Sequence, residues 1–421
     1  MPTIEAVACT VCGCVCDDLR ITVENDRITN AERACVLAEP WFAGQNTQHP
    51  PIAESHGQPI DITSALDQAA SLLKQSQAPL IYGLSRSTTE GQRAAVALAE
   101  KLGGTIDTTA ATGHAASLMA LQQVGESTCT LGEVRNRADL VIYWSSDPLT
   151  THPRHLERYS MEPKGRFVPD GRTLIVVDHQ PSATSAIADR FIQIPPGKDW
   201  EALSTLRALI KGIEPDASWN GGSIDEWRKL AERMKTCRFG IVFFGVQLTR
   251  EGIGHRQVEA LLTLVTELNA HTRFYARRMR RLGDVAGADS VLTWQTGYPF
   301  GVNFGRGYPR YNPGEFSGPE MLARREVDLC LFVGSETGSE FSPSALEHLR
   351  SIPVIALESP GTVTVVPPTI RFTTAVYGVH RTGTAYRMDE VPIPLRVLLP
   401  TPYPSDGEIL SELLSRVSQN R

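Results

Sequence analysis

Short apolar runs alternate with longer amphipathic segments along the 421 residues of this chain. Six runs of four to six residues are hydrophobic almost throughout: Pro79–Tyr82, Leu140–Trp144, Thr173–Val177, Gly240–Phe244, Asp328–Val333 and Pro353–Leu357. Continuous hydrophobicity over this length is typical of strands that are buried on both faces of a parallel sheet. The pattern therefore predicts six buried parallel strands.

The segments between these runs carry the signals of helices. Thr88–Leu102 is rich in alanine and ends before Gly103, a residue type that often closes helices. Ile253–Leu268 has apolar residues at helical spacing, and Ser405–Arg421 predicts a terminal helix. Strands that alternate with helices in this way favour an α/β architecture, with helices on the faces of parallel sheets.

Loops of small residues follow several predicted strands. They are Gly83–Ser85, Gly245–Gln247 and Gly334–Gly338. Because open α/β sheets bind ligands outside the carboxyl ends of their strands, we expect these loops to line a cavity. The sequence contains no dinucleotide fingerprint and no phosphate-binding P-loop, so nucleotide binding has no specific support.

Charge and composition exclude several classes of function. The formal net charge of −6 lacks the basic footprint of a nucleic-acid-binding protein. No eighteen apolar residues follow one another, which predicts a chain without a membrane-spanning helix. Met1–Val7 has neither the basic start nor the apolar core of a secretory signal, so we expect a cytoplasmic protein.

Five of the eight cysteines fall within the first 35 residues, and they predict a metal site rather than a disulfide framework. Cys9, Cys12, Cys16 and Cys35 offer four thiolates, which suit either a [4Fe–4S] cluster or tetrahedral zinc. Their spacing alone leaves both open, beside the plainer interpretation of free thiols. Cys14 is a spare thiol on the same loop and a candidate substitute ligand, but we expect a tight loop to turn its side chain outward as a non-ligand. The other three, Cys129, Cys237 and Cys330, are interpreted as core residues.

Longer strings then identify a family. The chain resembles the B-type subunits of formylmethanofuran dehydrogenase, which belong to the molybdopterin oxidoreductase superfamily. The strings that carry this resemblance are Cys9–Leu19, Arg27–Cys35, Gly125–Asp139, Ile142–Pro148, His152–His155, Trp294–Pro299, Gly307–Glu315 and Gly383–Asp389. They extend over nearly the whole chain and follow one another in the order of the family.

The resemblance implies a molybdopterin-oxidoreductase-like α/β fold with interleaved segments. Residues 1–55 would form a small domain around the cysteines, residues 56–115 and 300–421 one parallel-sheet domain, and residues 116–299 a second. In the family, a [4Fe–4S] cluster lies beside a tungsten or molybdenum bis-pterin centre and carries electrons when CO₂ and formate are interconverted. Its four ligands map onto Cys9, Cys12, Cys16 and Cys35, which favours the cluster over zinc.

Three departures from the family pattern point to a lost metal. Gly113 stands where the family has its metal-ligating cysteine or selenocysteine, and glycine has no side chain that could ligate. The adjacent His114 is retained, and we interpret it as a hydrogen-bonded cavity residue rather than a catalyst. Val36–Ala38 and Arg280–Asp284 differ from the family strings that line the pterin cavity. We therefore expect the bis-pterin centre to be absent and this chain to carry no catalytic residue.

A chain of this kind resembles the B-type subunits of bacterial formyltransferase/hydrolase complexes in one-carbon metabolism. That resemblance implies a redox-inactive B-type subunit with A-, C- and D-type partner subunits, of which the A and D types carry the catalysis on formyl-methanofuran analogues. One alternative is an active tungsten or molybdenum dehydrogenase with unusual metal ligation. Another is a structural module that contains zinc.

Two basic features have competing interpretations. Arg277, Arg278, Arg280 and Arg281 form either a solvated or interface face paired with carboxylates, or an anion site for a polyglutamate-bearing cofactor. His152 and His155 have a spacing that zinc accepts. Pro153 suggests a helix start and no third ligand is evident, so we favour a structural role for both histidines.

Overall fold

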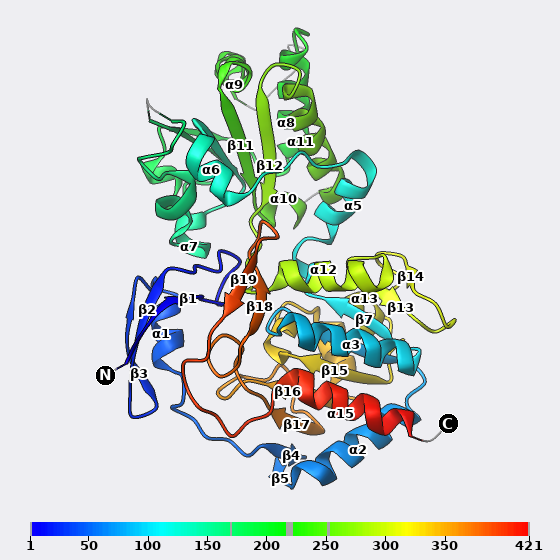
Figure 1. Cartoon of the computed structure of the whole chain (residues 1–421). Coiled ribbons are helices and arrows are strands. Elements are labelled where there is room, and N and C mark those ends of the chain that lie inside the picture. The colour runs from blue at the N-terminus through cyan, green and yellow to red at the C-terminus, as the bar shows by residue number, and fades with distance from the viewer. Residues whose placement is uncertain (1, 169–170, 216–221, 251–252, 420–421) are drawn as a thin grey trace. The chain divides into compact units, whose positions relative to one another are not determined.

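The computed structural model describes residues 2–168, 171–215, 222–250 and 253–419. These residues divide into two compact units. The first unit combines Met1–Gly113 with Leu282–Arg421, and the second comprises His114–Arg281. The chain therefore leaves the first unit once, builds the second, and returns (Figure 1).

The first unit is built on a nine-stranded sheet. In spatial order its strands are β14 (Arg310–Tyr311), β13 (Val302–Asn303), β7 (Thr105–Thr108), β6 (Pro79–Gly83), β15 (Leu329–Val333), β16 (Val354–Glu358), β17 (Ile370–Thr373), β4 (Ala53–Ser55) and β5 (Gln58–Pro59). The five central strands from β7 to β17 are parallel, and the short strands at both edges pair antiparallel.

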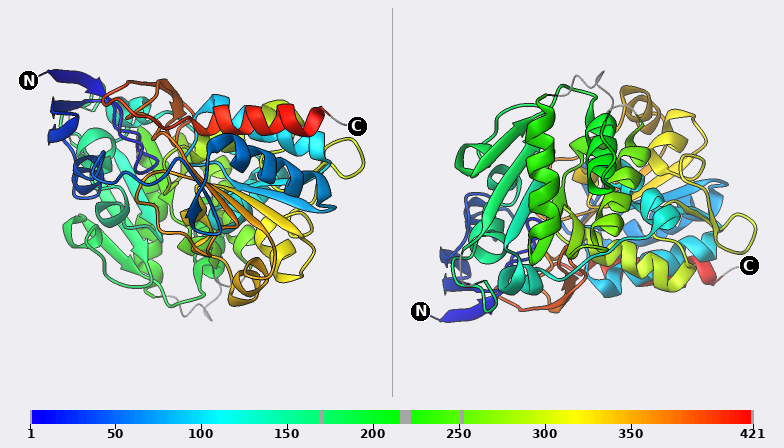
Figure 2. Two further views of the ribbon diagram at one scale, coloured as in Figure 1. Left: turned by 90° about the horizontal axis from the view of Figure 1, so that it is seen from below. Right: turned by 90° about the horizontal axis from the view of Figure 1, so that it is seen from above.

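Side chains of the central strands alternate between two hydrophobic cores, which explains why their sequences are apolar throughout. Ile81 and Leu331 pack in one core, whereas Tyr82 and Phe332 pack in the other. The first core is covered by α2 (Ile62–Gln75), α3 (Thr89–Leu102), α12 (Val285–Thr296) and α15 (Asp406–Ser418). Helices α13 (Gly318–Ala323) and α14 (Pro343–Leu349) cover the second. The red helix α15 and the blue helix α2 lie side by side in Figure 2.

The N-terminal segment forms a small antiparallel sheet in the same unit. Its strands are β1 (Thr3–Val7), β2 (Leu19–Glu24) and β3 (Arg27–Glu32), and α1 (Ala38–Ala43) follows. The sequence predicts a separate domain over residues 1–55, but the described contacts group these residues with the first unit. The reason is a shared core, in which Ala8 and Val15 pack against the hairpin of β18 (Gly383–Tyr386) and β19 (Pro392–Leu395).

The second unit holds a five-stranded, fully parallel sheet. Its strands in spatial order are β10 (Arg190–Gln193), β9 (Thr173–Asp178), β8 (Leu140–Trp144), β11 (Phe239–Phe244) and β12 (Arg273–Arg278). Its longer helices are α5 (Ala115–Val124), α6 (Leu131–Arg137), α8 (Asp199–Ile210), α9 (Ile224–Thr236) and α11 (Gly254–Leu268). The short helical turns of the two units are α4 (Ala110–Gly113), α7 (Pro148–Thr151), η1 (Leu156–Ser160), η2 (Ser185–Ile187), α10 (Gln247–Arg250) and η3 (Ser335–Gly338).

The predicted α/β architecture is confirmed, element by element. All six apolar runs form buried parallel strands, as β6, β8, β9, β11, β15 and β16. Helix α3 begins at the predicted place, where the Thr88 side chain accepts from the Gly91 amide, and it ends at Gly103 with a φ of 66°. Within the described residues, no helix combines the length and apolar character needed to span a membrane.

The second unit ends at Arg281 rather than at the predicted residue 299. Helix α12 belongs to the first unit because it packs against α3. Its N-cap, Asp284, is fully buried and accepts hydrogen bonds from the Gly287 amide at 3.1 Å, Gln92 Nε2 at 3.0 Å and the Tyr386 amide at 2.6 Å. One carboxylate thus joins α12, α3 and β18.

Replacing Asp284 with alanine should lower the free energy of unfolding by roughly 2–4 kcal/mol, because the helix loses its cap, the part-buried Tyr386 amide loses its acceptor and the buried Gln92 amide loses one of its three acceptors. Asp284→Asn keeps one acceptor oxygen and should cost less. Urea unfolding of the full chain measures both. Equal midpoints for wild type and Asp284→Ala would contradict this role.

Candidate functional site

The N-terminal cysteines lie on a closed loop between β1 and β2. The Cys9 amide donates to the Cys16 carbonyl at 2.8 Å, and the Val15 amide donates to the Cys12 carbonyl at 3.1 Å. The Gly13 carbonyl accepts from the Met388 amide at 2.8 Å, which fixes the loop against the β18–β19 hairpin. The loop is therefore held by the rest of the first unit and does not depend on its own small core.

The fourth predicted ligand reaches this loop from the segment after β3. Cys35 precedes α1, and its carbonyl accepts from the Ala38 and Glu39 amides at 2.9 Å each. Burial raises the pKa of the Cys9 thiol, and the neighbouring thiols of Cys12, Cys16 and Cys35 raise it as well. The first unit thus brings the thiols of Cys12, Cys16 and Cys35 near enough to Cys9 to influence its pKa.

The expectation that Cys14 points outward is wrong. Its side chain is buried, and hydrogen bonds with Cys12 and Cys16, followed by burial, raise the pKa of its thiol. The cause is a tight turn closed by the bond from Val15 to Cys12, with Val15 at a φ of 36°. This turn brings the Cys14 thiol within hydrogen-bonding distance of Cys12 and Cys16.

Four thiols from two segments have the chemistry that an iron–sulfur cluster or zinc requires. Among the residues that the structure describes, no three histidine, cysteine or carboxylate side chains are placed as ligands of one metal ion. Val36 follows Cys35 and is 74% exposed. It is the apolar residue at the position where the family often has a basic one.

Gly113 is the last residue of α4, which follows the carboxyl end of β7. Its amide donates to the Thr109 carbonyl at 3.0 Å. A Cβ atom here would meet no heavy atom of the described chain within 4 Å, apart from its sequence neighbours and its own helix. The next residue, His114, is buried and starts α5 by accepting at its carbonyl from the Ser117 and Leu118 amides.

The arginine run lies on β12 and just after it. The side chains of Arg277, Arg278 and Arg280 are buried, so a solvated face is the wrong interpretation for these three, whereas Arg281 is exposed. Arg278 Nη2 lies 3.1 Å from Glu126 Oε2 in a buried ion pair. Because neighbouring residues of a strand face opposite sides of the sheet, Arg277 and Arg278 do not share one surface. The anion site stays a prediction.

The two histidines after α7 have separate partners. His152 Nε2 lies 2.7 Å from the Arg280 carbonyl oxygen, and its Nδ1 lies 2.9 Å from Thr151 Oγ1. His155 Nδ1 lies 2.8 Å from the Tyr143 hydroxyl. Both rings are buried and point to different groups, which supports the structural interpretation over a zinc pair.

Polar residues at the carboxyl ends of β8 and β9 escaped the sequence analysis. Asp199 is 1% exposed; it accepts from Trp144 Nε1 at 2.7 Å and lies 2.9 Å from His179 Nε2. This is the edge at which open α/β sheets bind ligands. The available signal was Asp178–His179, which directly follows the predicted strand Thr173–Val177.

The predicted cavity loops belong to different units. Gly83 and Gly334 follow the adjacent strands β6 and β15, and the Leu84 amide donates to the Val333 carbonyl at 3.1 Å. Gly83 has a φ of 115°, and a Cβ there would lie 2.4 Å from the Val333 oxygen, so only glycine fits. Gly245 directly follows β11 in the second unit.

Comparison with known proteins places these features in a family. No protein-family model matches the chain. It is 40% identical over 429 residues to the B-type subunit of the tungsten-containing formylmethanofuran dehydrogenase 2 of Methanocaldococcus jannaschii, covering 99% of both chains. The corresponding subunit of Methanococcus maripaludis is 37% identical over the full length of both.

The chain belongs to the family of formylmethanofuran dehydrogenase B-type subunits. A further relative, the B-type subunit of the formyltransferase/hydrolase complex Fhc of Methylorubrum extorquens, is 27% identical over 280 residues, which cover 66% of this chain and 73% of that subunit. The resemblance recognised in the sequence is thereby confirmed.

Solved structures confirm the fold. The formyltransferase/hydrolase complex of Methylorubrum extorquens, crystallised with methylofuran, contains a chain that matches with a TM-score of 0.73 at 23% identity, covering 87% of this chain and 99% of that one. Acetylene hydratase from Pelobacter acetylenicus matches with a TM-score of 0.70 at 12% identity, covering 99% of this chain and 69% of that one. Both likenesses are to the molybdopterin-oxidoreductase type of α/β fold.

The buried His152 predicts a loss of stability in acid. Burial lowers its pKa to about 4, and the charge of Arg281 lowers it as well. An unfolded histidine titrates near 6.5, so between roughly pH 6.5 and 4 the unfolded chain binds the extra proton. The free energy of unfolding should therefore decrease as the pH is lowered from 6.5 to 4, by up to roughly 3 kcal/mol in total.

His152→Gln should remove this part of the acid sensitivity, because glutamine carries no titratable group but can still donate to the Arg280 carbonyl. Urea unfolding of both proteins at pH 7 and pH 5 gives the difference. His380, also buried with a pKa lowered to about 4, is unchanged in the variant and cancels in the comparison. Identical pH slopes would show that His152 is not the cause.

Proposed function

We propose that this chain is a redox-inactive B-type subunit of a cytoplasmic formyltransferase/hydrolase complex, acting on formyl-methanofuran analogues in one-carbon metabolism. Catalysis lies with partner subunits of the A and D types, a C-type subunit completes the complex, and this chain supports their assembly. The observation that carries the proposal is Gly113, which leaves a member of a metal-dependent family without a side chain at the expected ligand position.

The surroundings of Gly113 support the loss of a ligand. A side chain would have room at this position, because a Cβ meets no described atom beyond its own helix and chain neighbours. The glycine is therefore not imposed by packing, and its φ lies outside the left-handed region that favours glycine. A constraint of the fold does not explain why the thiolate is missing.

Partner subunits are supported by the relatives. The Methylorubrum relative is a subunit of the complex Fhc, and the solved complex of that organism contains methylofuran. Every relative described above is itself named as the B-type subunit of a larger enzyme or complex. Assembly with partners is consistent with a full-length fold that has lost its own chemistry.

For the N-terminal site we propose a [4Fe–4S] cluster held by Cys9, Cys12, Cys16 and Cys35, with zinc as the other occupant to be tested. The support is the match of their spacing to the family and the influence of the other three thiols on the pKa of Cys9. A bound cluster supplies one-electron transfer in this family. In this chain the four thiols would instead brace the loop between β1 and β2.

The alternative, an active dehydrogenase that binds tungsten or molybdenum through pterin sulfurs and an inorganic ligand, has one observation in its favour. The relatives that match at 37–40% identity over the full chain are named as tungsten-containing enzymes. The Fhc relative is less similar, at 27% over two thirds of this chain. Overall sequence identity thus favours the tungsten-containing enzymes, whereas Gly113 at the ligand position favours a redox-inactive subunit.

The first test is activity of the complex purified without oxygen. We expect no reduction of an artificial dye by formate or a formyl-methanofuran analogue, while hydrolysis of the formyl group proceeds. Gly113→Cys should fold normally, because its Cβ has space, and should still reduce no dye. Dye reduction that depends on this chain would establish the alternative.

The second test concerns the cysteines. Cys12→Ser and Cys35→Ser should each lose bound iron and speed proteolysis within the first ~50 residues, because a ligand of the brace is missing. Cys14→Ser is the matched control, since a hydroxyl can replace its hydrogen bonds and it is not a proposed ligand. Iron and acid-labile sulfide are measured on all three. Iron retained by Cys12→Ser and Cys35→Ser would contradict the assignment, and zinc in wild type would replace the cluster.

A further inference from the structure

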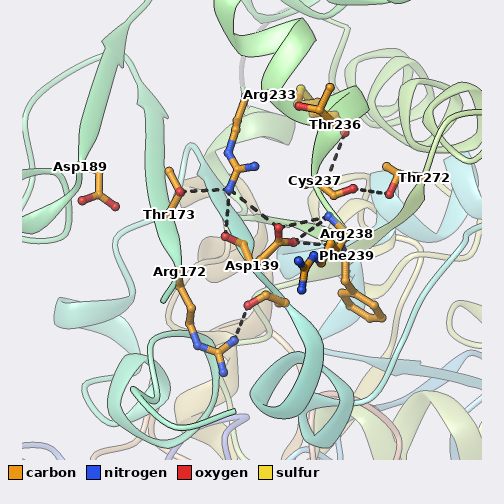
Figure 3. Close-up of polar contacts among 12 residues, drawn as sticks. Asp139, Arg172, Thr173, Asp189, Arg233, Thr236, Cys237, Arg238, Phe239 and Thr272 are labelled. Atoms are coloured by element: carbon orange, nitrogen blue, oxygen red, sulfur yellow. Dashed lines mark hydrogen bonds and ion pairs between the residues drawn. The ribbon is translucent and has the colours of Figure 1, made fainter. Parts of the chain in front are cut away.

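A small cavity lies in the second unit at the amino ends of its strands, away from the carboxyl edge where open α/β sheets bind ligands. It has a volume of about 260 Å³. Asp139 precedes β8, Thr173 begins β9 and Arg238 precedes β11, and all three line it. Arg172 and Arg233 complete the polar wall. Figure 3 shows that Arg233 reaches toward Thr173 and Asp139, whereas the Arg172 guanidinium points away from Asp139.

The only carboxylate among the described lining residues is already engaged. Both oxygens of Asp139 accept from the Arg238 amide at 3.1 Å, and Oδ1 also accepts from the Phe239 amide at 2.9 Å. Arg233 Nη2 lies 3.9 Å from Oδ2. The negative charge of Asp139 therefore lies near the Arg233 guanidinium, and its hydrogen bonds come from backbone amides.

Arg172 forms a fixed positive wall of the cavity. Its Nε donates to the Glu162 carbonyl at 2.8 Å, and its Nη1 donates to the Val134 and Ala138 carbonyls at 3.0 and 2.5 Å. These acceptors orient the guanidinium, but they carry no formal charge that would neutralise it. Burial lowers the pKa of Arg172, as expected for a cation held partly out of water.

The other two arginines leave donors available at the mouth. Arg233 is partly exposed, and its Nη2 donates to Thr173 Oγ1 at 3.2 Å. The Arg238 side chain is exposed. At the rim, the Phe167 ring is 50% exposed, with the Arg137 and Arg166 guanidinium carbons 4.7 and 5.4 Å from its centroid. Positive charge thus extends beyond the cavity itself.

We propose that this cavity binds a single oxyanion group, a phosphate or a carboxylate, between Arg233 and Arg238 with Arg172 behind them. Guanidinium groups match the planar, bidentate geometry of such anions. The volume is below the roughly 300 Å³ at which pockets accept whole drug-sized ligands, so one anionic group is the fitting occupant. A free anion and an acidic group of a partner subunit present the same chemistry. This inference is independent of the proposed function.

The test is calorimetric titration of the full chain with inorganic phosphate, and separately with acetate, at low ionic strength, where screening is weak. We expect saturable binding of at least one anion. Arg238→Gln should weaken it about tenfold or more, because a charge-assisted donor is lost. The exposed Arg238 side chain makes this variant safe for folding, which far-UV circular dichroism checks.

Arg256→Gln is the matched control, because Arg256 is an exposed arginine of the same unit that pairs with Glu259 at 2.5 Å on α11. It should bind the anion as wild type does. Repeating the titration on the assembled complex identifies the source: retained binding indicates a free anion, and lost binding indicates that a partner's acidic group fills the cavity. Equal affinities of wild type and Arg238→Gln, meaning an adventitious ion only, or no binding of either anion, would overturn the proposal.

Discussion

Parallel strands cannot be joined by tight turns, and this constraint governs the whole arrangement of the chain. Each of the two sheets needs crossover helices on both faces, and the first unit obtains them from segments far apart in sequence. Helices α2 and α3 precede the second unit, whereas α12 and α15 follow it, yet all four cover one core. The second unit is therefore an insertion between β7 and α12, and Gly113 lies where the chain leaves the first sheet.

Much of this fold was predictable because both faces of the central strands are buried. A run such as Leu140–Trp144 contains no charged residue that would interrupt its apolar pattern, and each of the six predicted runs forms a strand. Strand β12 was missed because its sequence, Arg273–Arg278, is dominated by arginines whose burial depends on tertiary partners such as Glu126. The compact units divide at Arg281 rather than at residue 299, because Asp284 binds groups almost 200 and about 100 residues away in the sequence, which no local pattern records.

The candidate site was predictable in composition but less so in geometry. The four cysteines were identified by spacing, and their role as ligands stays a prediction, because no three of the described side chains are placed around one metal ion. The direction of Cys14 was not predictable, because it depends on a left-handed φ at Val15, a residue type that rarely adopts one. Asp199 is 55 residues from Trp144 in the sequence, so no local pattern links the two. It becomes the partner of Trp144 and His179 because β8 and β9 lie side by side in the sheet.

A lost ligand is compatible with an intact fold because neither core contains the ligand position. The hydrophobic clusters of both units consist mainly of strand and helix residues, and Gly113 contributes to none of them. A glycine at this position therefore leaves the energetics of packing almost unaffected. The N-terminal cysteines differ, since Cys9, Cys12 and Cys16 lie on a loop that packs with Tyr377 and the β18–β19 hairpin, and we expect their loss to have a structural consequence.

We propose that this member of the family holds no redox metal at the position of Gly113. The most direct test is elemental analysis by mass spectrometry of the intact complex, purified without oxygen from cells supplied with tungstate and molybdate. We expect the complex to contain far less than one atom of tungsten or molybdenum per chain, with iron or zinc at the N-terminal cysteines. One atom of tungsten or molybdenum per chain would contradict it.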